Sequence, residues 1–158
     1  MTATINLISF YCDNLLLKYA KGTYLNMQRI TIYDQRQGDV GHDVLEAVIR
    51  ENGDLALEGY NFGDQADELW SDSDRVFYTI IKAENVPKVL DKLISERFKK
   101  ATAFETWLKE LTARIGPVKD RTDPMVLLWL LKERFEKDRI FSTWLEKNKI
   151  PHDLLHKD

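Results

Sequence analysis

The side chains of this 158-residue chain that could do chemistry are three histidines, one cysteine and many carboxylates. His152 and His156 are four residues apart, the spacing with which one face of a helix can hold a metal ion. Only Asp153 and Asp158 stand nearby as further ligands, so we expect no metal site there. Cys12 lies in an apolar segment, which favours a small buried hydrophobic residue over a nucleophile.

The motifs of phosphate-binding and catalytic sites give no stronger signal. The glycine-containing stretch 38–42 lacks the strand–loop–helix context of a phosphate-binding loop, and no P-loop or dinucleotide fingerprint occurs. A hydrolase would have to rely on His42 and nearby carboxylates, and no pair of carboxylates stands out as acid and base. We therefore predict no enzyme, no catalytic residue and no cofactor.

Composition and charge describe an ordinary soluble domain, with 44% hydrophobic and 31% charged residues. A net charge of −3 provides no basic field that would gather phosphates. One cysteine excludes a disulfide framework and makes the cytoplasm the default compartment. No stretch reaches the roughly 18 apolar residues of a membrane span, and the N-terminus lacks the features of a signal peptide.

The clearest pattern is an internal repeat. Residues 87–108 and 124–145 align without gaps at an offset of 37, and 12 of the 22 positions are identical, including Glu-Arg-Phe and Thr-Trp-Leu. Each unit begins with a proline after a capping residue and breaks near 99–102 or 136–139, so it predicts a helical hairpin. The helical spacing of Trp107 and Trp144 predicts core packing, and the Glu-Arg pairs predict structural ion pairs.

Before the repeat, β-branched and aromatic residues predict strands. These strands cover residues 28–36, 44–50, 54–60 and 75–82. Asn52-Gly53 between two apolar segments predicts a hairpin with a type I′ turn, which would set Val48 opposite Leu57 unless a G1 bulge shifts the register. The first 26 residues favour a further hairpin over a helix, and the acidic stretch 61–74 predicts a solvated loop.

These elements predict an α+β fold in a single compact domain. Residues 1–85 would form an antiparallel sheet of four to six strands, and residues 86–158 would form the two helical hairpins packed on it.

The two units differ on one face of their first helix. Met125, Leu128 and Trp129 stand where the first unit has Lys88, Asp91 and Lys92. A helix that is apolar nearly all round must bury more than one face. Two explanations are open: burial within the chain, or a protein-interaction face that contacts a second copy or another protein.

The order of four strands and a helix over about residues 28–98 resembles the single-strand-binding fold of the Whirly and positive cofactor 4 proteins. That resemblance implies a basic sheet face with aromatic platforms. Acidic residues instead outnumber basic ones on these strands: Asp34, Glu46, Glu51, Asp54 and Glu58 against Arg29, Arg36 and Arg50. The segment from Gln28 through the paired helices is also similar to small bacterial proteins of unknown function, which implies no activity.

We therefore expect a non-enzymatic cytoplasmic protein that acts by binding another protein. It would be an interaction or regulatory protein, such as an acidic inhibitor or immunity-type partner of a basic protein, or it would associate as a homodimer. The alternative function is single-stranded nucleic-acid binding through the sheet face.

Overall fold

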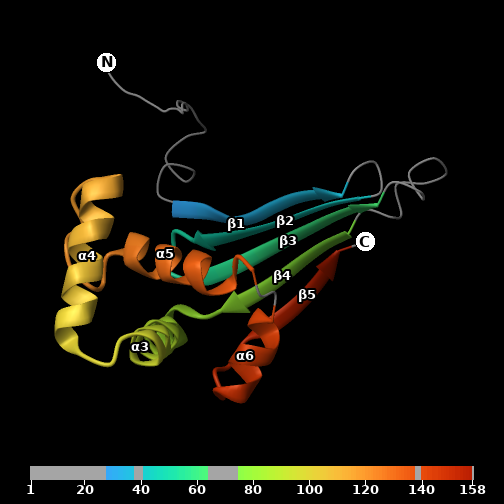
Figure 1. Cartoon of the computed structure of the whole chain (residues 1–158). Coiled ribbons are helices and arrows are strands. Elements are labelled where there is room, and N and C mark those ends of the chain that lie inside the picture. Colours follow the sequence, from blue (N-terminus) through green and yellow to red (C-terminus); the bar gives the residue numbers. More distant parts are fainter. Residues whose placement is uncertain (1–27, 38–40, 64–74, 138–139, 158) are drawn as a thin grey trace.

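The computed structural model describes residues 28–37, 41–63, 75–137 and 140–157, which form an antiparallel sheet and a set of helices. The strands, in the order in which they lie side by side, are β1 (Gln28–Gln37), β2 (Gly41–Ile49), β3 (Leu55–Gly63), β4 (Arg75–Ile81) and β5 (Asp153–Lys157). Between β4 and β5 come a short 3-10 turn, η3 (Ala83–Asn85), and the helices α3 (Val86–Arg97), α4 (Ala101–Ile115), α5 (Pro124–Phe135) and α6 (Phe141–Lys147). In Figure 1, α5 lies across one face of the sheet, α6 lies on the same side, and α3 and α4 stand toward and beyond the strand ends. The predicted α+β class is confirmed.

The hairpin between β2 and β3 forms where it is predicted, and of the two registers left open it adopts the one shifted by a G1 bulge. Gly53 has a φ of +93°, and it is the only residue of the described turn with a positive φ, which excludes a type I′ turn. The Gly53 N–H donates to the carbonyl of Arg50 at 2.9 Å, as in a three-residue loop that ends in a G1 bulge. This longer loop sets Val48 opposite Ala56 instead of Leu57.

A buried carboxylate ties this turn to the start of the helices. Asp54 is 9% exposed and its Oδ1 accepts a hydrogen bond from the backbone N–H of Ala83 at 2.8 Å. Its Oδ2 accepts from the side-chain amide of Asn52 at 3.2 Å. The turn therefore fixes the point at which the chain leaves the sheet for α3.

The fifth strand falls in the segment that the sequence assigns to the helical hairpins. Residues 153–157 return to the sheet and pair with β4, so that Leu155 stands opposite Tyr78. His156 lies in this strand, and its predicted helical spacing with His152 is therefore not realised.

The break inside each helical hairpin lies close to its predicted position. Residues 98–100 separate α3 from α4, and residues 136–140 separate α5 from α6. Asp123 caps α5, since its Oδ1 accepts from the backbone N–H of Met125 at 3.0 Å, and Pro124 follows in the first turn. Asn85, the N-cap residue of α3, makes no side-chain cap.

Helix α5 is packed against β1 and β2 on one side and α3 on another. Leu128 is fully buried there. The Lys132 ammonium donates to the carbonyl of Thr31 at 3.0 Å and lies 3.3 Å from that of Ile32, where β1 has a register irregularity. The matching face of α3 is exposed. This difference explains why one repeat is polar and the other apolar at equivalent positions.

The core joins the sheet to both hairpins. Trp107 is 5% exposed and Trp144 is 3% exposed, which confirms that both tryptophans are core residues. Ile32, Leu57 and Ile81 contribute to the same cluster from the sheet.

Some predictions concern residues outside the described ranges. These are the hairpin within the first 26 residues, the acidic loop beyond residue 63 and the surroundings of Cys12. None of the helices among the described residues combines the length and the apolar character that crossing a bilayer requires.

Candidate functional site

The two repeats meet through pairs that cross from one unit to the other. Glu133 of α5 accepts a hydrogen bond from the indole Nε1 of Trp107 on α4 at 3.0 Å. The same carboxylate forms ion pairs with Arg97 of α3 and, at 3.1 Å, with Arg114 of α4. All three partners of Glu133 therefore belong to the first helical hairpin, formed by α3 and α4.

Glu96 of α3 makes the reciprocal contacts. It accepts from the Nε1 of Trp144 at 2.9 Å and from the Nε of Arg134 at 2.8 Å, both in the second repeat. Because Glu96 and Glu133 are equivalent residues, the two hairpins face each other as two subunits do across a two-fold axis. The Glu-Arg pairs are ion pairs, as predicted, but each one joins two repeats.

The aromatic side chains repeat in space as well as in sequence. The rings of Phe104 and Trp107 are stacked with centroids 6.0 Å apart and an interplanar angle of 17°. Those of Phe141 and Trp144 are 6.1 Å apart at the same angle. The phenylalanine of each Glu-Arg-Phe packs against its pair. The aromatic spacing therefore builds the core of each hairpin.

Both crossing glutamates are held in the charged form. Burial raises the pKa of the Glu133 carboxyl, but the hydrogen bonds from Arg97, Trp107 and Arg114 outweigh it and hold that pKa below its ordinary value. The pKa of Glu96 is lowered in the same way, because its two hydrogen-bond donors outweigh the effect of burial.

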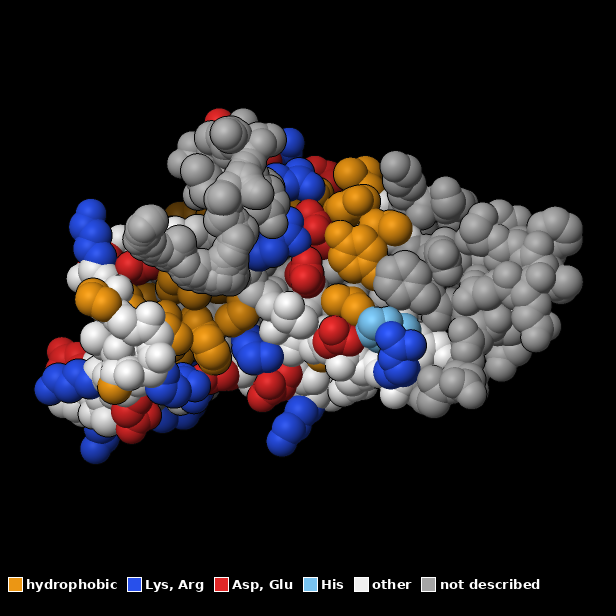
Figure 2. Space-filling model, turned by 90° about the horizontal axis from the view of Figure 1, so that it is seen from above, with side chains coloured by type: hydrophobic (Ala, Val, Ile, Leu, Met, Phe, Trp, Pro, Cys, Tyr) orange, Lys and Arg blue, Asp and Glu red, His pale blue; other side chains and the backbone are white. Residues whose placement is uncertain are grey.

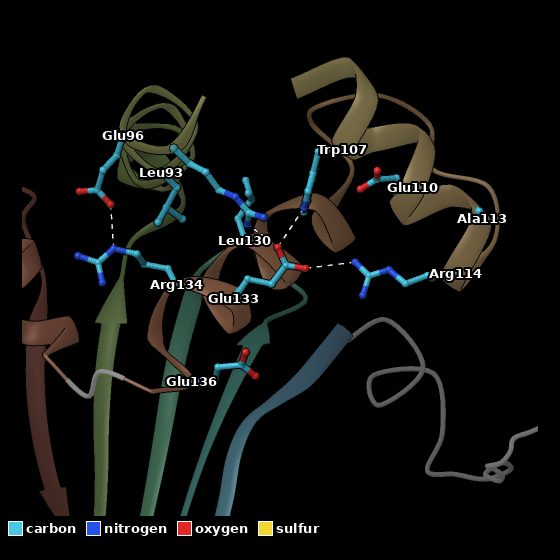
Figure 3. Close-up of a pocket in the computed structure, with 11 residues that line it drawn as sticks. Leu93, Glu96, Trp107, Glu110, Ala113, Arg114, Leu130, Glu133, Arg134 and Glu136 are labelled. Atoms are coloured by element: carbon cyan, nitrogen blue, oxygen red, sulfur yellow. Dashed lines mark hydrogen bonds and ion pairs between the residues drawn. The ribbon is translucent and has the colours of Figure 1, made fainter. Parts of the chain in front are cut away.

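A cavity of about 970 Å³ lies between the hairpins at these pairs. Leu93 and Leu130, one from each repeat, line it together with the ring of Trp107. Figure 3 shows Glu133 between Trp107 and Arg114, with α4 on one side of the cavity and α3 on the other. The candidate site is therefore built on the axis that relates the two repeats.

Most charged side chains that line this cavity are paired with an opposite charge, and one is not paired with any described residue. The arginines that line it are bound to Glu96 or Glu133. Glu136 is 3.8 Å from Lys132. Glu110, by contrast, is exposed on α4 and forms no hydrogen bond or ion pair with any described residue. A carboxylate at the cavity is therefore available to a ligand.

The approximate symmetry fails at this carboxylate. Lys147 stands 37 residues after Glu110 and lines a smaller cavity of about 450 Å³ beside Trp144. Helix α4 has 15 residues and α6 has 7, and Ala113 and Arg114 continue the wall of the larger cavity along α4 beyond Glu110. At equivalent positions, the larger cavity therefore has the acidic side chain of Glu110 and the smaller cavity has the basic side chain of Lys147.

The predicted interaction face is largely turned into the molecule. Leu128 is fully buried, and Met125 and Trp129 are partly buried against the core. The guanidinium of Arg114 lies 4.8 Å from the ring centroid of Trp129. Burial within the chain accounts for Leu128, and self-association through this face stays a prediction.

The histidine that could support a hydrolase lies in β2, where its Nε2 is 2.5 Å from Oδ1 of Asp34 on β1. Neither side chain lines the two cavities between the hairpins. Among the described residues no group of three histidine, cysteine or acidic side chains could hold a metal ion.

The outer face of the sheet, opposite the helices, mixes charged and apolar side chains (Figure 2). Arg29 is 2.5 Å from Glu46 and 3.7 Å from Glu58, so its charge is already neutralised. Tyr60 donates to Glu58 at 3.1 Å, and burial together with that carboxylate raises the pKa of Tyr60 to about 12. This part of the face does not offer a free cation to a phosphate.

No protein-family model matches the chain, and searches of curated proteins and of solved structures returned no significant match. The site has to be interpreted from its own geometry.

Proposed function

We propose that this chain is a non-enzymatic protein-binding module, which receives a basic side chain of a partner protein in the cavity between its two hairpins. The observation that carries this proposal is the carboxylate of Glu110, which lines the cavity and has no hydrogen bond or ion pair with any described residue. It stands beside an apolar lining that includes Leu93 and Leu130.

This combination suits a lysine or an arginine. The long aliphatic stem of either side chain packs on apolar surface while its charged end pairs with a carboxylate. The volume of about 970 Å³ lies at the upper end of the range of about 300–1,000 Å³ that ligand pockets occupy. A net charge of −3 would favour the approach of a basic partner.

An inhibitory or immunity-type role is one form of this function, with a basic protein as the bound partner. The single cysteine supports a cytoplasmic location for such a role. Single-stranded nucleic-acid binding is not favoured, because Arg29 on the sheet face is already paired with Glu46 and Glu58.

Fluorescence anisotropy with short labelled peptides tests the proposal. We expect oligolysine to bind with an affinity that falls as salt rises, and oligoglutamate and oligothymidine to bind at least tenfold more weakly. Glu110→Gln should weaken the binding of oligolysine by about tenfold or more, because charge-assisted hydrogen bonds contribute about 1.5–3 kcal/mol.

Glu105→Gln is the matched control, since Glu105 is exposed on the same helix and does not line the cavity. Equal effects of Glu105→Gln and Glu110→Gln would mean that oligolysine responds only to net charge, and the proposal would be rejected. Tight binding of oligothymidine would favour the nucleic-acid function instead.

A further inference from the structure

One edge of β5 is not paired with any strand of the described sheet. Its other edge pairs with β4. Leu154 is 55% exposed and Leu155 is 53% exposed, more than any other large hydrophobic residue among those described. An unpaired strand edge offers backbone N–H and C=O groups to a further strand, and exposed leucines increase that tendency.

The opposite edge of the sheet is protected in ways that β5 is not. Strand β1 has a register irregularity between Thr31 and Tyr33, and Lys132 binds the carbonyl of Thr31. Such an irregularity discourages edge-to-edge pairing. Strand β5, by contrast, pairs with β4 without a break in register.

The residue order of β5 shows which strand would fit this edge. It reads Asp-Leu-Leu-His-Lys from residue 153 to residue 157. We propose that β5 pairs with β5 of a second copy of this chain, antiparallel and centred on Leu155, so that the two sheets become continuous.

In this register the strand is complementary to itself. Position 153 stands opposite position 157 of the second copy at both ends, so that an aspartate meets a lysine twice, and Leu155 stands opposite Leu155. Opposite charges directly across a pair of strands stabilise it, and like charges destabilise it. A shift by two residues would place an aspartate opposite Leu155 and leave the lysine without a partner, so the charges select one register.

A strand of five residues buries less surface than the roughly 1,200–2,000 Å² of standard protein interfaces. The association should therefore be reversible and depend on concentration. It does not involve Glu110 or the cavity, and it stands or falls independently of the proposed function.

Sedimentation velocity with exchanged charges tests the proposal. We expect the wild-type chain to approach twice its mass of 18.5 kDa as concentration rises. Asp153→Lys and Lys157→Asp should each weaken association at least tenfold, because like charges then meet at both ends. An equimolar mixture of the two variants should dimerise again, since every lysine of one chain then faces an aspartate of the other.

Glu105→Lys and Lys109→Glu are matched controls, because they make the same charge changes at exposed positions of α4. Circular dichroism of each variant checks that the fold is kept. A wild-type chain that remains monomeric at high concentration overturns the proposal. Dimers that survive both single variants, or a mixture that stays monomeric, also overturn it, because the contact would then lie elsewhere.

Discussion

The carboxylate of Glu133 and the indole Nε1 of Trp107 lie 3.0 Å apart, although one belongs to the second repeat and the other to the first. A buried indole N–H needs a hydrogen-bond partner. Since each repeat supplies that partner to the other, neither hairpin is complete by itself. The repeats should therefore unfold together.

Replacing either core tryptophan should destabilise the protein strongly. We expect Trp107→Ala and Trp144→Ala each to lower the free energy of unfolding by about 3–5 kcal/mol, the usual loss for a buried aromatic side chain. Urea unfolding followed by circular dichroism measures this change. Losses well below that range at both positions would contradict a core role.

The hydrogen bonds between the two repeats can be measured separately from the burial of the tryptophan rings. In a double-mutant cycle, Trp107→Phe and Glu133→Gln should show a coupling free energy of about 0.5–3 kcal/mol, because the two side chains are bonded to each other. Trp107→Phe combined with Glu96→Gln should be additive within about 0.5 kcal/mol. Coupling to Glu96 instead of Glu133 would show that the pairs form within each repeat.

Acid should weaken the contact between the hairpins. The pKa of Glu133 is lowered in the folded protein, so its contribution to stability is complete above its ordinary value of 4.5 and is lost as the pH falls through the folded pKa. We expect the free energy of unfolding to fall below about pH 4.5, and to fall less steeply in Glu133→Gln. Urea titrations between pH 3 and 7 measure both slopes, and equal slopes would disprove this assignment.

Leu128→Lys distinguishes a core position from an interaction face. Because Leu128 is fully buried, the variant should lose about 3–5 kcal/mol or unfold, since it places a charge in the core. Asp91 is the equivalent residue of α3, where it is exposed and paired with Arg121. Apart from the loss of this ion pair, Asp91→Lys should lower the free energy of unfolding by no more than about 1 kcal/mol. A Leu128→Lys variant that stays folded but is monomeric, while the wild-type chain is dimeric, would restore the interaction-face explanation.

Sequence periodicity is sufficient to locate the core of the helical half. Phe104, Trp107, Phe141 and Trp144 recur at helical spacing, and the structure stacks them in two similar clusters. Periodicity does not reveal which glutamate binds which tryptophan, because identical motifs allow pairing within a repeat as well as between repeats. The cavity that depends on this crossing could not be predicted either.

The errors in the sheet have local causes. Asn52-Gly53 marks the turn correctly, but a single positive φ at Gly53 makes the loop one residue longer than a type I′ turn. Strand β5 has two apolar residues among polar ones and follows the second hairpin directly, so nothing in its sequence outweighs the helical pattern before it. The contacts of Lys132 could not be predicted from the sequence, because its partners are backbone carbonyls of β1.

The pairing of β5 with β4 has a consequence for the order of folding. Each of the strands β1 to β4 pairs with the strand that comes next to it in the chain, whereas Ile80 and Asp153 are separated in the chain by the whole helical half. Closing so long a loop carries an entropic penalty that must be met before the contacts form, and non-local contacts slow folding. Strand β5 should therefore join the sheet after both hairpins have formed, as the final step of folding.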